Sequence, residues 1–203
     1  YAEENHVPII EKAVAQLLKV LLKIIKPKNI LEIGTAIGYS ALIMASSIDE
    51  NSNITTIERR LDMIELAEKN INSAKYKDKI KILYGEAEEI LPSLNDKFDF
   101  IFLDAAKGQY LEFFNNCMNL INKEGVIVSD NVLFKGMVAS DKLVIRRKKT
   151  IVKRLREYLR HINHLNGYSS CITGRFLVSA HTSGNLYLKN GARHYQCQCL
   201  LLS

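Results

Sequence analysis

Five short apolar runs, each followed by a polar or helical segment, constrain the fold more than any other feature of this sequence. The runs lie at 29–34, 53–58, 80–84, 98–103 and 125–129, and helices are expected at 38–48, 61–74, 86–91 and 110–121. Strands that are apolar along nearly their whole length are typical of a parallel sheet covered on both faces. Right-handed crossovers then favour a doubly wound α/β fold with the first strand central and a ligand crevice at the strands' carboxyl ends.

The segment before these units is also patterned. Apolar residues recur at three- and four-residue steps between Ile9 and Ile25, which predicts an amphipathic helix that ends before Pro27. The 203 residues are 47% hydrophobic and include no repeat, linker or low-complexity tract. A chain of this size buries one large core, so we expect a single domain over residues 1–203.

The sequence also bears on location. No apolar run is long enough to cross a bilayer, and the first residues do not form a signal peptide. The cysteines form no CxxC pair and no metal quartet: Cys117, Cys171, Cys197 and Cys199. Reduced thiols are typical of the cytoplasm, so we expect a cytoplasmic protein with no membrane partner.

A glycine turn follows the first strand, in the stretch Asn-Ile-Leu-Glu-Ile-Gly-Thr-Ala-Ile-Gly-Tyr-Ser at 29–40. Gly34 and Gly38 can adopt dihedrals and close approaches that a Cβ would forbid, and the next helix directs unpaired N–H groups toward a ligand over the turn. The pattern departs from GxGxxG because Ala36 occupies the second glycine position. Alone, the stretch fits an ordinary strand–turn–helix as well as a nucleotide-like site.

An acid at the end of the second strand gives the turn a partner. Glu58 follows Gly34 by 24 positions, close to the spacing at which an acid accepts hydrogen bonds from ribose hydroxyls. The alternative is a solvent-facing acid beside Arg59 and Arg60. The glycine turn favours the ribose role.

Oxygen-bearing side chains follow the fourth and fifth strands. Asp104 ends one run, and Asp130 and Asn131 end the other. These strands are expected to be neighbours about 4.8 Å apart, so their ends converge at the ligand rim. Two carboxylates and an amide carbonyl are hard ligands that suit Mg²⁺, although each acid alone could be a helix N-cap. The pair on adjacent strands favours the metal site.

Lys107 lies one short turn beyond Asp104 and can reach the substrate face of such a metal. A lysine near a cation, and partly removed from water, is disfavoured in its charged form and can serve as a general base. A surface lysine that extends into solvent is the alternative.

Together these motifs resemble the cation-dependent O-methyltransferases related to catechol and caffeoyl-CoA methyltransferases. The resemblance rests on the turn at 31–40, Glu58, the Asp-Ala-Ala-Lys sequence at 104–107, and Asp130-Asn131, and it covers about residues 1–172. Within the family, the chain is most similar to the bacterial branch that methylates 5-hydroxyuridine at the tRNA wobble position. The opening sequence Ala-Glu-Glu-Asn-His-Val-Pro-Ile is similar to that branch too.

The resemblance implies a Rossmann-like class I methyltransferase fold that binds S-adenosylmethionine. The methionine end would lie along the glycine turn, the ribose at Glu58, and the adenine at Gly85-Glu86-Ala87. The full implied cofactor set is Glu32, Gly34, Thr35, Ala36, Gly38, Tyr39, Ser40, Glu58, Gly85, Glu86, Ala87 and Asp104.

The resemblance also implies a mechanism. Asp104, Asp130 and Asn131 match the metal ligands, and Lys107 matches the base. The metal would bind a substrate hydroxyl and its neighbouring oxygen and favour the oxyanion. Lys107 would accept the proton, and the oxyanion would attack the sulfonium methyl in line.

A strongly basic segment lies between residues 142 and 160, with nine Lys or Arg side chains against one acid, Glu157. An apolar stripe in the same segment predicts a helix with one buried face. A solvated basic face is the usual explanation, but a phosphate backbone would bind here too. We expect a tRNA anticodon region to contact Arg146, Arg147, Lys148 and Lys149.

The end of the chain departs from the family pattern. A strand at 168–172 is expected, and residues 173–203 form a divergent tail in which strands are predicted at 176–180 and 185–189. The seventh strand of the fold, and any contribution of the tail to dimerisation, therefore cannot be assigned from sequence. The apolar first helix and the family together suggest a homodimer.

Three other functions fit parts of the sequence. The same chemistry could act on a small catechol-like or acyl-CoA phenolic substrate. A non-catalytic RNA-binding protein could keep the fold, but it would not need Asp104, Lys107, Asp130 and Asn131. A dinucleotide dehydrogenase could use the glycine turn, but hydride transfer does not use the paired acids.

Overall fold

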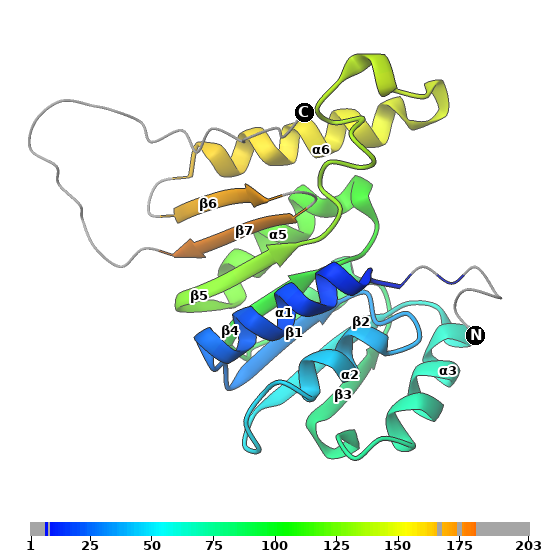
Figure 1. Ribbon diagram of the computed structural model, residues 1–203, viewed down its shortest axis with the longest axis vertical. Helices are drawn as coiled ribbons and strands as arrows, with labels where there is room; N and C mark the ends of the chain where they lie inside the picture. The colour runs from blue at the N-terminus through cyan, green and yellow to red at the C-terminus, as the bar shows by residue number, and fades with distance from the viewer. Residues whose placement is uncertain (1–6, 8, 166–167, 174–175, 182–203) are drawn as a thin grey trace, which may run out of the picture.

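The computed structural model describes residues 7, 9–165, 168–173 and 176–181, which build one seven-stranded sheet (Figure 1). The strands are β1 (Asn29–Ile33), β2 (Asn53–Glu58), β3 (Ile80–Tyr84), β4 (Phe98–Leu103), β5 (Ile121–Ser129), β6 (Tyr168–Thr173) and β7 (Phe176–His181). Their order is β3-β2-β1-β4-β5-β7-β6. The first five are parallel, and β7 runs antiparallel to both neighbours. The predicted doubly wound α/β sheet with β1 between β2 and β4 is confirmed.

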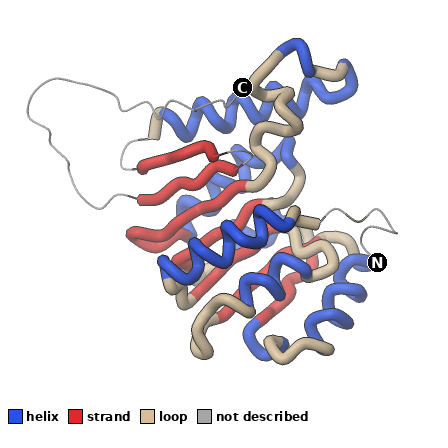
Figure 2. Tube along the Cα trace, in the orientation of Figure 1, coloured by secondary structure: helices blue, strands red, loops and turns tan. Residues whose placement is uncertain are grey.

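Helices cover both faces of the sheet (Figure 2). They are α1 (Lys12–Ile25), α2 (Tyr39–Ala45), α3 (Leu61–Asn72), α4 (Ala87–Ser93), α5 (Tyr110–Leu120) and α6 (Lys149–Asn163). One apolar cluster joins α1 and α2 to one sheet face, and a second joins α4, α5 and α6 to the other. Both faces of β1 and β4 are therefore buried, which explains why their sequences are apolar without alternation.

The basic segment differs from the prediction at its start. Only Lys149–Asn163 is α-helical, and two 3₁₀ turns, Asp141–Leu143 and Arg146–Lys148, come before it. The amino end of a helix carries partial positive charge, so a run of four cations is unfavourable within its first turn. The helix therefore begins at the last of the four.

The seventh strand lies inside the tail that departs from the family pattern. β7 (Phe176–His181) inserts between β5 and β6 and pairs with both, so the strand predicted at 176–180 is present. The strand predicted at 185–189 lies outside the described residues.

In the described part of the chain, none of the helices is both long and apolar enough to span a bilayer.

Candidate functional site

A cleft of about 390 Å³ opens at the carboxyl ends of β1, β2 and β4. Most of the predicted cofactor residues line it, as does the predicted base: Gly34, Thr35, Ala36, Tyr39, Ser40, Glu58, Gly85, Glu86, Ala87, Asp104 and Lys107. Four of the predicted cofactor and metal residues, Glu32, Gly38, Asp130 and Asn131, are not among its lining residues, and neither are the predicted tRNA contacts Arg146, Arg147, Lys148 and Lys149. The sheet topology thus brings the donor turn and the Asp104–Lys107 segment to one cavity.

Gly34 is required by a close contact between two strands. Its φ is +106°, and a Cβ at this position would lie 2.2 Å from the carbonyl oxygen of Asp104. The backbone of β1 therefore turns directly against the end of β4, where no side chain fits. This contact puts the glycine turn and Asp104 on the same wall of the cleft.

Glu58 fixes the rest of the turn. Its Oε2 accepts a hydrogen bond from the backbone N–H of Ala36 at 2.9 Å, and Ala36 has a φ of +45°. Its Oε1 accepts from the backbone N–H groups of Arg59 and Arg60, each at 3.0 Å. The carboxylate therefore joins the end of β2 to the turn after β1. It keeps acceptor capacity, because each carboxylate oxygen can accept two hydrogen bonds.

Glu32 lies beneath the turn and is fully buried. The Thr56 hydroxyl donates to its Oε2 at 2.6 Å, and the Thr35 and Thr56 hydroxyls are also 2.6 Å apart. Burial is the main reason that the pKa of Glu32 rises from 4.5 to about 7. Hydrogen bonds from Ser40 and Thr56 oppose the rise, and the nearby Asp104 and Glu58 add to it. Glu32 supports the turn from below and has no contact with the cleft.

After the end of β4, Lys107 and Asp104 form an ion pair. The Lys107 Nζ lies 2.8 Å from Asp104 Oδ1 and 2.8 Å from the hydroxyl of Tyr110. Both charged side chains are shielded, at 16% and 26% exposure. Asp104 is therefore already paired with a cation of the chain itself.

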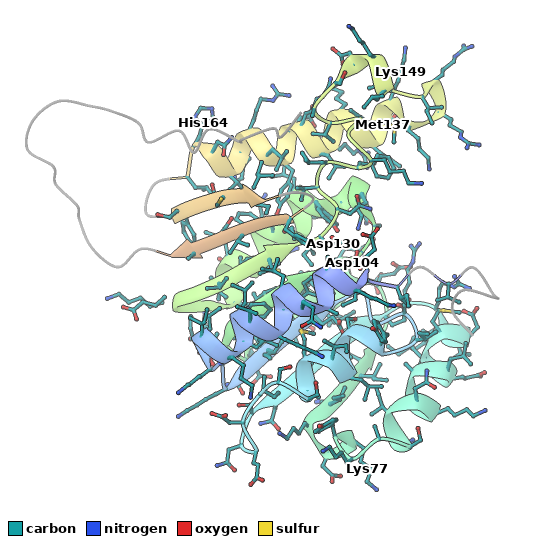
Figure 3. All side chains as sticks on the ribbon, in the orientation of Figure 1. Lys77, Asp104, Asp130, Met137, Lys149 and His164 are labelled. Carbon is teal, nitrogen blue, oxygen red and sulfur yellow. The ribbon has the colours of Figure 1, made fainter. Side chains whose placement is uncertain are left out.

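Asp130 lies beside Asp104, as predicted from neighbouring strands (Figure 3). Leu103 of β4 pairs with Ser129 of β5, and the Asp130 backbone N–H donates to the Leu103 carbonyl at 3.0 Å. Asn131 follows with a φ of +57°. Within the described residues no group of three or more His, Cys, Asp or Glu side chains could hold a metal. The predicted set has two acids and an amide, whose oxygens are hard donors of the kind that Mg²⁺ prefers.

Helix α6 contacts the Lys107 segment. The Arg154 side chain donates from Nη1 to the carbonyl oxygen of Gly108 at 3.2 Å. Arg146, Arg147 and Lys149 at the amino end of α6 are exposed, and Lys148 Nζ lies 5.8 Å from the centre of the Phe134 ring. The basic segment is therefore adjacent to the cleft through α6.

Comparison with known proteins identifies the family. The sequence model of the O-methyltransferase family matches residues 3–167. The chain belongs to the O-methyltransferase family.

Individual relatives agree with this assignment. The catechol O-methyltransferase of Niastella koreensis is 37% identical over 128 residues, which are 61% of this chain and 58% of that protein. A candidate caffeoyl-CoA O-methyltransferase from Staphylococcus aureus has a similar structure, with a TM-score of 0.83, 36% identity and coverage of 89% and 88% of the two chains. TomG from Streptomyces achromogenes, an O-methyltransferase of tomaymycin synthesis solved with SAM, superposes with a TM-score of 0.78 at 25% identity, covering 89% and 86%.

The chain spans less than two thirds of the length of the curated relatives that it matches first.

Two residues of this O-methyltransferase family member were missed by the sequence analysis. Tyr110 contacts Lys107, and its spacing of three residues from Lys107 was the available signal. Arg156 of α6 donates to the carbonyls of Met137 and Val138 at 3.2 and 3.0 Å and pairs with Asp141 at 2.7 Å. Arg156 thus fixes the segment between β5 and α6, and its position in a basic run concealed this role.

Proposed function

We propose that this chain transfers a methyl group from S-adenosylmethionine to a hydroxyl oxygen of an acceptor bound in the cleft. The observation that carries the proposal is that the donor turn, Glu58 and the Asp104–Lys107 pair line one cavity. The family membership and the SAM bound to TomG support it.

The cleft residues suit the cofactor. When bound, S-adenosylmethionine would supply an electrophilic methyl group on a sulfonium sulfur. Gly34 and Ala36 bring backbone to the cavity wall, and the remaining acceptor capacity of Glu58 would take a ribose hydroxyl. Gly85, Glu86 and Ala87 line the cavity after β3, where the adenine would lie.

The acids on β4 and β5 fit a divalent cation such as Mg²⁺. Asp104 and Asp130 follow paired residues of neighbouring strands, and Asn131 adds a neutral oxygen donor. These three would hold the ion, which would polarise an acceptor oxygen and favour its anionic form. Lys107 pairs with Asp104 at 2.8 Å, so the lysine sits where that oxygen would release its proton.

Lys107 is then the proton acceptor. Of the described residues that line the cleft it is the only lysine, and the arginines there are too weakly acidic to exchange a proton. In its neutral form the Lys107 Nζ would take the hydroxyl proton. Bound S-adenosylmethionine would supply the methyl group to the resulting oxygen and would be left as S-adenosylhomocysteine. Positioning of the two reactants supplies much of the rate.

For the acceptor we propose a phenolic hydroxyl beside a second oxygen, as in a catechol. Relatives of the chain are named as catechol or caffeoyl-CoA O-methyltransferases, and two adjacent oxygens match a cation that has open positions. Arg146, Arg147, Lys148 and Lys149 favour a second candidate, the 5-hydroxyuridine of a tRNA anticodon. Three of them are exposed beside the helix that contacts the Lys107 segment.

One assay separates these acceptors. Labelled S-adenosylmethionine would be incubated with catechol, with caffeoyl-CoA, and with tRNA from a strain that lacks the modification, each with Mg²⁺ or with chelator. We expect Mg²⁺-dependent transfer to a vicinal-oxygen acceptor. Transfer to none of them by folded protein that binds S-adenosylhomocysteine would reject the enzyme and favour a binding protein.

The metal ligands have a test of their own. Asp104→Ala is expected to lower the Mg²⁺-dependent rate by about 10²-fold or more, since the ion loses a charged ligand. Unchanged activity of the wild type in chelator would remove the metal from the proposal.

A cytoplasmic homodimer remains part of the proposal. Val20 and Ile24 of α1 are 55% and 72% exposed, and they lie four residues apart on one side of the helix. Light scattering of the wild type and of Ile24→Glu tests the dimer.

A further inference from the structure

The buried hydroxyl of Tyr110 forms hydrogen bonds with three residues next to the cleft, Lys107, Leu103 and Asp130. Tyr110 is 1% exposed, and its oxygen accepts from Lys107 Nζ at 2.8 Å. The same oxygen lies 2.9 Å from the carbonyl of Asp130 and 3.2 Å from the carbonyl of Leu103. Tyr110 therefore connects Lys107 to the ends of both β4 and β5.

The directions of these hydrogen bonds follow from the groups involved. Carbonyl oxygens only accept, so the single phenolic proton must serve Asp130 and Leu103. A lone pair of the hydroxyl is then directed at Lys107. Burial and the carboxylates of Asp104 and Asp130 hold the pKa of Tyr110 well above its ordinary value, which keeps the proton on this oxygen.

Lys107 has a second acceptor on its other side. Its Nζ donates to Asp104 Oδ1 at 2.8 Å, and it also lies 5.0 Å from the centre of the Tyr110 ring. A lysine side chain has four rotatable bonds and would otherwise sample many rotamers. Two fixed acceptors select one of them.

The two acceptors determine the direction of the lone pair on the Lys107 amine. A neutral amine has two N–H groups and one lone pair. If the two N–H groups donate to Asp104 and Tyr110, the lone pair is left for the third direction, and Lys107 lines the cleft.

We propose that Tyr110 is a positioning residue that orients the Lys107 amine toward the acceptor hydroxyl. The inference rests on the proposed function of Lys107 as proton acceptor. Tyr110 itself contacts no reacting atom and acts only through Lys107.

Tyr158 supplies a matched control. It is also fully buried, its hydroxyl lies 2.6 Å from Ser129 Oγ, and its ring packs edge-on against Tyr110 with centroids 5.6 Å apart. Within the described part of the chain, Tyr158 makes its hydrogen bond and ring contacts with Ser129, Tyr110 and Phe114, and none with Lys107. Tyr158→Phe therefore removes a buried hydroxyl from the same layer without touching the amine.

The kinetic test is a double-mutant cycle in the full chain. Tyr110→Phe is expected to lower kcat by about tenfold or more while the affinity for S-adenosylhomocysteine stays unchanged, because only the amine is misplaced. In a protein that already carries Lys107→Met, adding Tyr110→Phe should not lower kcat further. Tyr158→Phe should leave kcat within about twofold.

Equal losses from Tyr110→Phe in both backgrounds would overturn the proposal, as would a kcat within twofold of wild type. A second readout does not depend on activity. The rate at which an acylating reagent labels Lys107, followed by mass spectrometry, should fall several-fold in Tyr110→Phe, because the amine lone pair is no longer held toward the cleft, and should stay unchanged in Tyr158→Phe. Equal labelling in wild type and Tyr110→Phe would reject the positioning role even if the wild type proved to transfer no methyl group.

Discussion

The two sides of the cleft reach unusual backbone conformations by different means. On the donor side, after β1 and β3, positive φ angles fall mainly on glycines: Gly34 at +106°, Gly38 at +81° and Gly85 at +146°. On the acceptor side, after β5, they fall on side-chain-bearing residues as well, including Asn131 at +57° and Lys135 at +57°.

The difference reflects what surrounds each backbone. The donor turn packs against the backbone of β4, so there is no room for a Cβ at Gly34. The acceptor segment is a series of turns held from outside, by Arg156 on two carbonyls and by the buried side chains of Val132 and Met137. A position with no room for a Cβ must be glycine, so it can be recognised in the sequence. A turn that is held by residues far away in the chain shows no such pattern in its own residues.

Gly34→Ala tests whether close packing against β4 determines the conformation of the donor turn, and it should have the largest effect. The new Cβ would meet the Asp104 carbonyl and occupy a positive φ, so we expect a loss of about 3–5 kcal/mol of folding free energy, or no folding. Urea unfolding measures it. Gly38→Ala is the control, because its Cβ would lie 3.3 Å from the end of the Ile71 side chain and 3.5 Å from the Ala67 Cα, so the change should cost about 1–2 kcal/mol from the positive φ. Equal costs would show that close packing does not set the donor turn.

Glu32 gives a pH-dependent test of the donor side. Its pKa is raised from 4.5 to about 7 in the folded chain, so the contribution of the protonated form to stability is complete below pH 4.5 and is lost as the pH rises to 7. The loss should be on the order of 2–3 kcal/mol. Glu32→Gln should remove this dependence. Urea unfolding at pH 5 and pH 8 measures it, and identical pH profiles for the two proteins would contradict the assignment.

Glu58 tests whether the donor turn is held for the cofactor. Glu58→Gln leaves one acceptor oxygen for the amides of Ala36, Arg59 and Arg60, so we expect S-adenosylhomocysteine to bind about 10- to 100-fold more weakly by calorimetry. Glu88→Gln is the control, since Glu88 also lines the cleft but its Oε1 accepts from the Gln109 side chain at 2.9 Å and not from the glycine turn. Similar losses in both variants would indicate a general charge effect.

Much of the fold was predictable because its signals are local. The strands at 53–58, 80–84 and 98–103 coincide with the apolar runs, and the glycine turn lies where predicted. The meeting of Asp104 with Lys107 followed from a three-residue spacing. These features depend on neighbours in the sequence or on the general topology of parallel sheets.

The remaining features depend on contacts between distant residues. The insertion of β7 between β5 and β6 cannot be read from its sequence, which fits an edge hairpin equally well. The role of Tyr110 depends on two carbonyls at the ends of different strands, and that of Arg156 on a turn about 18 residues before it. The glycine turn of the donor side was therefore predictable from local signals, and the acceptor side only in its charged groups.

The smallest predicted effect tests whether the acceptor segment is held by distant residues or by its own side chains. Lys135 is exposed at a φ of +57°, so Lys135→Gly relieves a strained conformation and should raise the folding free energy by up to about 1 kcal/mol. Lys153→Gly is the matched control. Lys153 is exposed within α6, where glycine costs about 1 kcal/mol relative to a good helix former, so the two substitutions should have opposite signs in urea unfolding. If both destabilise equally, the side chain of Lys135 itself holds the segment, and the acceptor side is fixed locally after all.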